Sequence, residues 1–272
     1  MSGTLYVVGT PIGNLGDMSP RGVSALETAD FIAAEDTRVT VKLLNHFGIK
    51  KEMLSYYEHN KSTKGNLIIK RLLEGESCAL VSDAGMPAIS DPGEDLVRQA
   101  RELGIPVEAV PGPSALVTAI SVSGFPCGRF CFEGFLSMNK IGRREHLESL
   151  KREKRTMIFY EAPHKLPATL NDFLKYFGDR KIVLVRELTK LHETVQTTTI
   201  SKAAEYYNEN TPKGEFVVIV EGYTEEIESY TLEDAVKIAK KLVDEGKSTS
   251  SAAKEAAEIT GIKKGEIYKA LI

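Results

Sequence analysis

The fold is decided by residues 5–16, LYVVGTPIGNLG, in which a short apolar run passes directly into a glycine-rich turn. Longer amphipathic stretches follow, and between them four more apolar runs recur, at Phe31–Ala34, Met53–Tyr56, Ala79–Ser82 and Val107–Val110. Short buried strands that alternate with helices are typical of a parallel sheet covered by helices. We therefore predict strands at Leu5–Val8 and at these four positions, in an α/β domain that spans residues 1–124.

A second α/β domain is predicted over residues 125–222. Its expected strands are Phe130–Gly134, Met157–Tyr160, Ile182–Arg186, Thr194–Ile200 and Phe216–Val220. The segment 192–200 is rich in threonine and valine and lacks the helix that a parallel crossover would need. We therefore expect a mixed or antiparallel sheet.

The remaining residues, 223–272, predict a small helical domain. Tyr223–Tyr230 is acidic and turn-like. Ser248 is a good N-cap for a helix that ends near Gly261, and Lys263–Ile272 forms the next helix. This pair resembles a helix-turn-helix and is a possible RNA-binding element.

The composition argues against several classes of protein. The apolar fraction of 42% is ordinary for a soluble domain, and no apolar run approaches the ~20 residues of a membrane span. The first residues lack the features of a signal peptide, so we expect a cytoplasmic protein with no membrane partner. The net charge of −3 gives no overall attraction to nucleic acid, so an RNA contact must come from a local patch.

The three cysteines do not have the spacing of a metal site. Cys127 and Cys131 form a single Cys-x3-Cys pair with no second pair of ligands, and Cys78 lies apart. We expect three buried, reduced thiols and no metal ion.

The turn after the first strand excludes two common nucleotide sites. It lacks the Gly-Lys-Ser/Thr ending of a P-loop, and its glycines have the spacing Gly-x3-Gly-x2-Gly, unlike that of a dinucleotide fingerprint. Pro11 fixes φ and removes a hydrogen-bond donor, which suits a stiff apolar wall better than a phosphate cradle. A purely structural turn remains an alternative.

Two further loops are expected at the same edge of the sheet. Residues 82–93, SDAGMPAISDPG, have the composition of a binding loop, in which Asp83 accepts hydrogen bonds and Ala84, Pro87 and Ile89 offer apolar contacts. Residues 111–115, PGPSA, place a serine at a helix N-terminus. Because the carboxyl ends of parallel strands share one edge, the three turns predict one ligand site.

Five motifs in this order carry a resemblance to a known family. They are GTPIGNLGD at 9–17, AEDTR at 34–38, the 82–93 loop, VPGPSA at 110–115 and FYEAPH at 159–164. With FEGFL at 132–136 and RELTK at 186–190, the chain resembles the bacterial 16S ribosomal RNA (cytidine-2′-O)-methyltransferases, which have the tetrapyrrole-methylase fold. The resemblance runs from Thr4 to about Gly222 and departs at Ser137, where proline is expected.

This resemblance implies two α/β domains with S-adenosylmethionine in the cleft between them, a homodimer, and a cytidine in the decoding region of 16S RNA as the methyl acceptor. The donor would contact the following residues: Pro11, Asp83, Ala84, Gly85, Pro87, Ile89, Ser90, Ser114, Ala115, Tyr160, Glu161, Ala162 and Glu215.

Methyl transfer to a ribose hydroxyl benefits from a general base, and several side chains qualify. Glu35 and Asp36 follow the second strand, and in an extended segment at most one of them needs to face the cleft. His164 follows a strand of the second domain, and Glu161, Glu187 and His192 are further candidates. We favour Asp36 or His164, with Glu35 retained; each is also a plausible helix cap or loop contact.

Residues 139–155 supply the local basic patch, with seven lysines or arginines against three glutamates. Such a surface can contact RNA phosphates without reading bases, although a solvated helix face is the alternative. Arg38 and Arg186 are expected to clamp phosphates or carboxylates. The expected RNA contacts are Arg38, Lys140, Arg143, Arg144, Lys151, Arg152, Arg155, Arg186, Lys263 and Lys264.

Two other functions compete. A methyltransferase of a tetrapyrrole or of a protein side chain would use the same scaffold but would need neither the basic segment nor the helical tail. A non-catalytic helix-turn-helix nucleic-acid-binding protein would have no use for three ligand turns.

Overall fold

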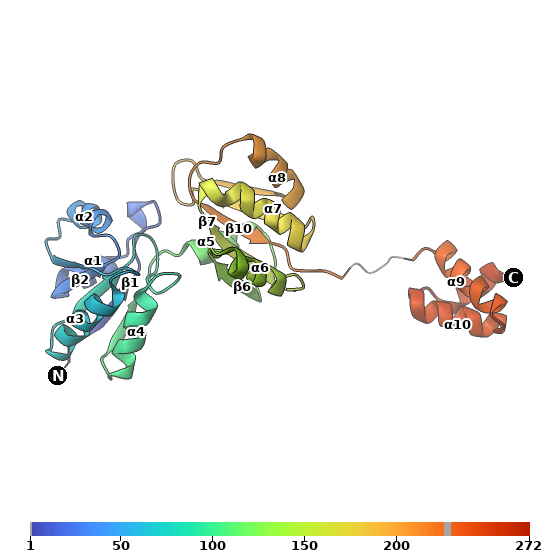
Figure 1. The fold of residues 1–272 in the computed structure, drawn as a ribbon, viewed down its shortest axis with the longest axis horizontal. Helices are drawn as coiled ribbons and strands as arrows, with labels where there is room; N and C mark the ends of the chain where they lie inside the picture. The colour runs from blue at the N-terminus through green and yellow to red at the C-terminus, as the bar shows by residue number, and fades with distance from the viewer. Residues whose placement is uncertain (1, 226–229) are drawn as a thin grey trace. The chain divides into compact units, whose positions relative to one another are not determined.

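The computed structural model describes residues 2–225 and 230–272, which form two compact units, Met1–Tyr223 and Thr224–Ile272. The first unit contains two five-stranded sheets (Figure 1). The first sheet is entirely parallel in the order β3-β2-β4-β1-β5. Its strands are β1 (Leu5–Val8), β2 (Phe31–Ala34), β3 (Glu52–Ser55), β4 (Cys78–Val81) and β5 (Val107–Val110). The expected parallel α/β arrangement is confirmed.

Alternating residues of the first sheet face two helical layers. Phe31 and Ala33 pack under α3 (Lys61–Leu73) and α4 (Gly93–Glu102). Ile32 and Ala34 pack under α1 (Pro20–Thr28) and α2 (Thr37–His46). With both faces covered, the central strands β2 and β4 are buried throughout, which explains the short apolar runs of the sequence.

The second sheet is mixed, as expected. Its order is β6-β7-β10-β8-β9, in which only β6 and β7 are parallel. The strands are β6 (Phe130–Gly134), β7 (Thr156–Glu161), β8 (Lys181–Arg186), β9 (Thr194–Thr199) and β10 (Phe216–Val220). One face packs with α6 (Lys140–Ser149), α7 (Leu166–Phe177) and α8 (Ile200–Glu209), where Phe159, Phe173 and Phe177 form an aromatic cluster.

Helix α5 (Ala115–Ser123) links the two sheets. It begins directly after β5 of the first sheet, but its buried Ala119 and Ile120 pack against Ile158, Val183 and other residues on the second face of the second sheet. The start of α5 is therefore placed where the loops of the first sheet meet the second sheet.

The C-terminal unit is a small three-helix bundle of α9 (Leu232–Asp244), α10 (Thr249–Thr260) and α11 (Lys264–Leu271). A capping box between Thr231 and Asp234 starts α9, and Ser248 caps α10 as expected. Its core consists of four alanines and Ile267. The acidic turn predicted for 223–230 includes residues 226–229, which lie outside the described part of the chain.

The cysteines depart in part from the expectation of three buried thiols. The three cysteines are free thiols, but only Cys78 is buried, and Cys127 is exposed because it lies in the loop between α5 and β6. Within residues 2–225 and 230–272, no helix is both long and apolar enough to cross a membrane.

Candidate active site

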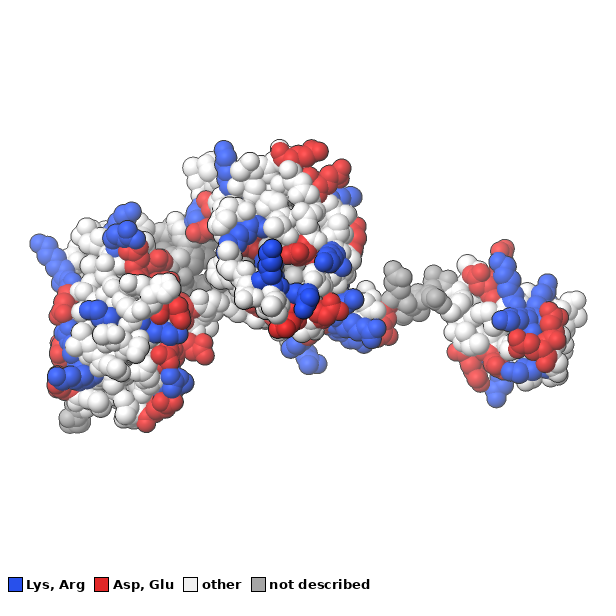
Figure 2. All heavy atoms as spheres, in the orientation of Figure 1, with Lys and Arg blue, Asp and Glu red and all other residues white. Residues whose placement is uncertain are grey.

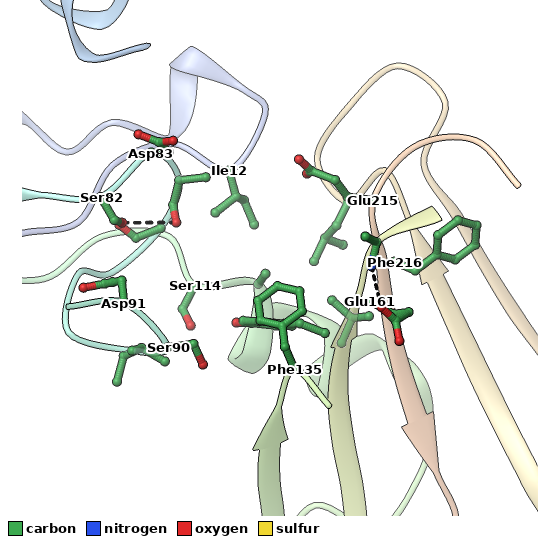
Figure 3. Close-up of a pocket in the computed structure, with 18 of the residues that line it drawn as sticks. Ile12, Ser82, Asp83, Ser90, Asp91, Ser114, Phe135, Glu161, Glu215 and Phe216 are labelled. Atoms are coloured by element: carbon green, nitrogen blue, oxygen red, sulfur yellow. Dashed lines mark hydrogen bonds between the residues drawn. The ribbon is translucent and has the colours of Figure 1, made fainter. Parts of the chain in front are cut away.

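The predicted ligand turns meet at one cavity of about 490 Å³. Its first wall comes from the carboxyl edge of the first sheet. Its second wall comes from the ends of β7 and β8 with the residues that follow them, from the start of β10 and the residue before it, and from Phe135 after β6. Figure 3 shows Asp83, Asp91 and Ser114 on one side of this space and Glu215 and Phe216 on the other. The volume is within the ~300–1,000 Å³ range of small-molecule sites.

Backbone hydrogen bonds fix the turn after β1 against the loop after β4. Thr10 and Gly85 form an isolated antiparallel bridge, with N···O distances of 2.9 and 3.1 Å. The buried Thr10 hydroxyl donates to the Ser82 carbonyl at 3.3 Å. Two loops that are 70 residues apart in the sequence therefore behave as one wall of the cavity.

Glycines allow the turns after β1 and β5 to touch. A Cβ atom on Gly112 would lie only 2.6 Å from the Gly9 carbonyl oxygen, and one on Gly9 would lie 2.7 Å from the Gly112 Cα. Both obstacles are backbone atoms, which cannot move aside as a flexible side chain can. The contact brings Ser114 and Ala115, at the start of α5, to the cavity.

The 82–93 loop is held in an unusual backbone conformation. Ala88 and Ser90 have φ of 67° and 66°, a region that costs energy for residues with side chains. Asp91 offsets this cost by accepting hydrogen bonds from the backbone N–H groups of Ala88 at 3.0 Å and Gly93 at 2.8 Å. The hydroxyl of buried Tyr56 donates to the Pro92 carbonyl. This loop is thus preorganised before any ligand arrives.

Two carboxyl groups face the cavity from the ends of β2 and β4. The Asp83 backbone N–H donates to Glu35 Oε2 at 3.5 Å, and the Asp36 N–H donates to Asp83 Oδ1 at 3.0 Å. Partial burial, and then the nearby Asp83 charge, raise the pKa of Glu35. Burial also raises the pKa of Asp83. Such groups hold protons more readily than ordinary carboxylates do, which suits a proton acceptor.

The second sheet contributes an apolar and aromatic wall. Val185, Leu188 and Val217 line it, and Tyr160 makes edge contacts with the rings of Phe132 and Phe135. The Tyr160 hydroxyl accepts a hydrogen bond from Leu116 N at 3.0 Å and so occupies a free donor at the start of α5. The two walls together form a site that is polar on one side and apolar on the other.

Residues 4–204 match the family model of the Tetrapyrrole (Corrin/Porphyrin) Methylases. The chain belongs to this family. A relative from Xylella fastidiosa, named ribosomal RNA small subunit methyltransferase I, is 50% identical over 274 residues, with 98% of each chain covered. Relatives of the same name from a Synechocystis species and from Escherichia coli O157:H7 are 46% and 44% identical, over 98% of this chain and 96% and 94% of theirs.

Solved structures of tetrapyrrole methylases and related enzymes have the same fold. A diphthine synthase aligns with a TM-score of 0.62 at 14% identity, covering 81% of this chain and 90% of its own. A uroporphyrin-III C-methyltransferase from Thermus thermophilus aligns at 0.59 with 18% identity, covering 80% and 97%. The two-sheet architecture with its cleft is therefore the family architecture.

Most of the side chains predicted to hold the donor line this tetrapyrrole-methylase cavity. Those that do are Asp83, Ala84, Gly85, Ile89, Ser90, Ser114, Ala115, Tyr160, Glu161, Ala162 and Glu215. Pro11 and Pro87 are not among the lining residues, and Ile12, the neighbour of Pro11, lines the cavity instead. The side chain that follows the proline, and not the proline itself, is thus exposed to the cavity.

The three candidate bases are separated by the structure. Of Glu35, Asp36 and His164, only Glu35 lines the cavity, and Glu161, one of the further candidates, lines it as well. Asp36 caps α2 and pairs with Arg38, whose hydrogen bonds lower the pKa of Asp36 to about 2. His164 is exposed in a short 3-10 helix, Pro163–Lys165, outside the cavity lining. The cavity lining therefore does not support the preference for Asp36 or His164, and Glu35 stays the predicted base.

Several lining residues have no distinct sequence signal. In sequence, three of them resemble ordinary apolar strand residues: Val185, Phe216 and Val217. Two others, Phe135 and Leu188, lie in motifs that also contain charged residues, and nothing in their type marks them as part of a site. Within the described residues, no group of three His, Cys, Asp or Glu side chains is arranged to hold a metal ion.

Proposed function

We propose that this chain transfers the methyl group of S-adenosylmethionine to the 2′-hydroxyl of a cytidine in 16S ribosomal RNA. One observation carries the proposal: a preorganised cleft of the methylase family places a carboxyl of raised pKa, Glu35, among its lining residues. The names of the full-length relatives support small-subunit RNA as the acceptor. Cytidine and the 2′-oxygen come from the resemblance of the sequence motifs.

The lining residues suit the chemical groups of this donor. The Asp83 carboxyl suits the positively charged amino and sulfonium groups of the donor. Ile12, Leu188 and Val217 offer apolar surface to its adenosine part. When bound, S-adenosylmethionine supplies an activated methyl group on a positively charged sulfur. The chain itself needs to orient the acceptor oxygen, which can contribute up to ~7–11 kcal/mol of barrier reduction.

Glu35 is the proton acceptor in this proposal. As the 2′-oxygen bonds to the methyl carbon, the Glu35 carboxylate takes the hydroxyl proton and the electrons of the broken C–S bond remain on sulfur. The Asp83 backbone N–H helps to orient the Glu35 carboxylate from the side of the 82–93 loop. General-base assistance of this kind typically contributes about 10²–10⁴-fold.

The RNA surface that we propose centres on α6 and the segment after it. Figure 2 shows Lys and Arg side chains gathered over the part of the chain that carries α6, with acidic side chains among them. Lys140, Arg144, Lys151 and Arg152 are exposed. Arg155 pairs with Glu153, and Arg186 donates to the Lys213 carbonyl, so these two are partly engaged already.

Reversing charge in this surface should weaken RNA binding strongly. We expect an Arg144→Glu/Arg152→Glu variant to bind small-subunit RNA at least tenfold more weakly at ~0.1 M salt, with a shallower dependence of log K on log salt. Filter binding over a salt series measures both quantities. A variant with unchanged slope and affinity would remove this surface from the proposal.

The C-terminal unit offers two further lysines that can contact RNA, although its segment 223–272 has more acidic residues than lysines. Lys263 and Lys264 are exposed where α11 begins, although the Lys264 ammonium group donates to the Ser250 hydroxyl. Arg38, exposed beside the end of β2, remains a further candidate. A homodimer that acts in the cytoplasm completes the proposal, on the resemblance alone.

The decisive test is transfer of labelled methyl from S-adenosylmethionine to small ribosomal subunits that lack the modification. We expect label in the 16S RNA, and labelling that is about 10²–10⁴-fold slower when Glu35 is replaced by glutamine. Label on a tetrapyrrole or a protein acceptor would favour the first rival, a methyltransferase with another substrate. Absence of donor binding would favour the second rival, a nucleic-acid-binding protein without catalysis.

A further inference from the structure

One carboxylate in the cavity wall has a buried partner network that the proposed reaction does not use. Glu161, at the end of β7, is only 5% exposed and lines the cavity. Its Oε1 accepts the backbone N–H of Ala162 at 2.9 Å, and its Oε2 accepts the hydroxyl of Thr169 at 2.5 Å. A buried carboxylate is costly unless it is hydrogen-bonded and its charge is compensated.

The compensating charge comes from α6, through the Thr169 hydroxyl. Arg143 donates from Nη2 to Thr169 Oγ1 at 2.9 Å and from Nε to Asp172 Oδ2 at 2.7 Å. The Arg143 side chain is only 19% exposed, and Thr169 is fully buried on α7. The guanidinium group therefore points into the domain, away from the solvent where RNA would bind.

The direction of this relay is fixed by its chemistry. A guanidinium group has donors only, so Thr169 must accept from Arg143, and its single hydroxyl proton is then left for Glu161. Each side chain thus provides the hydrogen bond that the next one needs, and the Asp172 carboxylate holds the Arg143 guanidinium group in place. Removing one link would leave a buried polar atom of this network without its hydrogen-bond partner beside the donor cavity.

We propose that Arg143 is a positioning residue of the donor site, acting through Thr169 on Glu161, and is not an RNA contact. Arg143 thereby leaves the set of expected RNA contacts in the basic segment 139–155. The inference rests on the proposed function, because the ligand whose binding it controls is the methyl donor. Neighbouring Arg144, exposed on the same helix, keeps the RNA role.

The test compares donor and RNA affinity in matched variants of the full chain. Binding of S-adenosylhomocysteine is measured by calorimetry without RNA, and RNA binding is measured separately. We expect Thr169→Val and Arg143→Lys to weaken S-adenosylhomocysteine binding by about tenfold or more while RNA affinity stays within about twofold. Thr169→Ser, which retains the hydroxyl, should restore donor affinity. Arg101→Lys, the control at an exposed arginine of α4 outside the proposed donor and RNA sites, should leave both affinities unchanged.

Unfolding temperatures show whether each variant is folded. If Thr169→Val fails to fold, Arg143→Lys and Thr169→Ser still decide the question. Folded variants with wild-type donor affinity, or an Arg143→Lys variant that loses only RNA affinity, would overturn the relay. If the unmodified chain itself binds no S-adenosylhomocysteine, the proposed function fails instead, so the two failures are distinct.

Discussion

Replacing Glu35 by glutamine should lower kcat for methyl transfer by about 10²–10⁴-fold, the usual contribution of a general base. Glutamine keeps the size of the side chain and its ability to accept the Asp83 N–H, but it cannot take a proton. Donor affinity should therefore change little. Single-turnover rates with saturating donor, together with calorimetric S-adenosylhomocysteine binding, separate the two effects.

Asp36→Asn is the matched control for Glu35→Gln. Asparagine is also a good N-cap, so α2 should remain intact, and Asp36 lies outside the cavity lining. We expect its kcat to stay within a few-fold of the original value. A large loss in Asp36→Asn with a small one in Glu35→Gln would reverse the assignment.

The pH dependence should report the same group. The base must be ionised to act, and burial raises the pKa of Glu35 above the usual range of a glutamate. The single-turnover rate should therefore fall as the pH drops through this raised pKa, at a higher pH than an ordinary glutamate would give. In the Glu35→Gln variant this fall in rate at low pH should be absent. A pH profile that the substitution leaves unaltered would show that another group accepts the proton.

The second large effect is expected from Gly112→Ala. The new Cβ atom would meet the Gly9 carbonyl oxygen at 2.6 Å, so the turns after β1 and β5 must separate. Such overpacking typically costs about 1–3 kcal/mol of folding free energy. Because Ser114 and Ala115 follow on the same turn and line the cavity, we also expect donor affinity to fall by about tenfold, which is a loss of ~1.4 kcal/mol of binding free energy.

Gly128→Ala is the control for this substitution. No heavy atom lies within 4 Å of the position that a Cβ atom would take at Gly128. Chemical denaturation and calorimetry should show little change for Gly128→Ala and losses of both stability and donor binding for Gly112→Ala. Equal behaviour of the two variants would contradict the close contact of the turns.

The central strands could be predicted closely from the sequence because they are buried on both faces. Apolar runs such as Phe31–Ala34 and Phe216–Val220 have no other reading in this context, and the observed strands have the same bounds. The placement of α5 was harder. Its helical pattern is clear, but local sequence does not reveal that it packs against the second sheet.

The site could be predicted where a loop has a distinctive composition. It was harder to predict where the role of a residue depends on the direction of its side chain. The 82–93 loop stands out by its glycines, prolines and aspartates. By contrast, Glu35 and Asp36 are adjacent carboxylates, and only the cap of α2 and the pairing with Arg38 turn Asp36 away from the reaction. Arg143 and Arg144 are likewise alike in sequence and differ only in the face of α6 that they occupy.

The measurement that tests the central claim most directly is mass spectrometry of 16S RNA after incubation of unmodified small subunits with the chain and S-adenosylmethionine. Digestion to fragments and then to nucleosides locates the methyl group on base or ribose. We predict a single new 2′-O-methylcytidine at one position, dependent on Glu35. A methyl group on a base, or RNA that gains no mass although the chain binds the donor, would contradict the assignment.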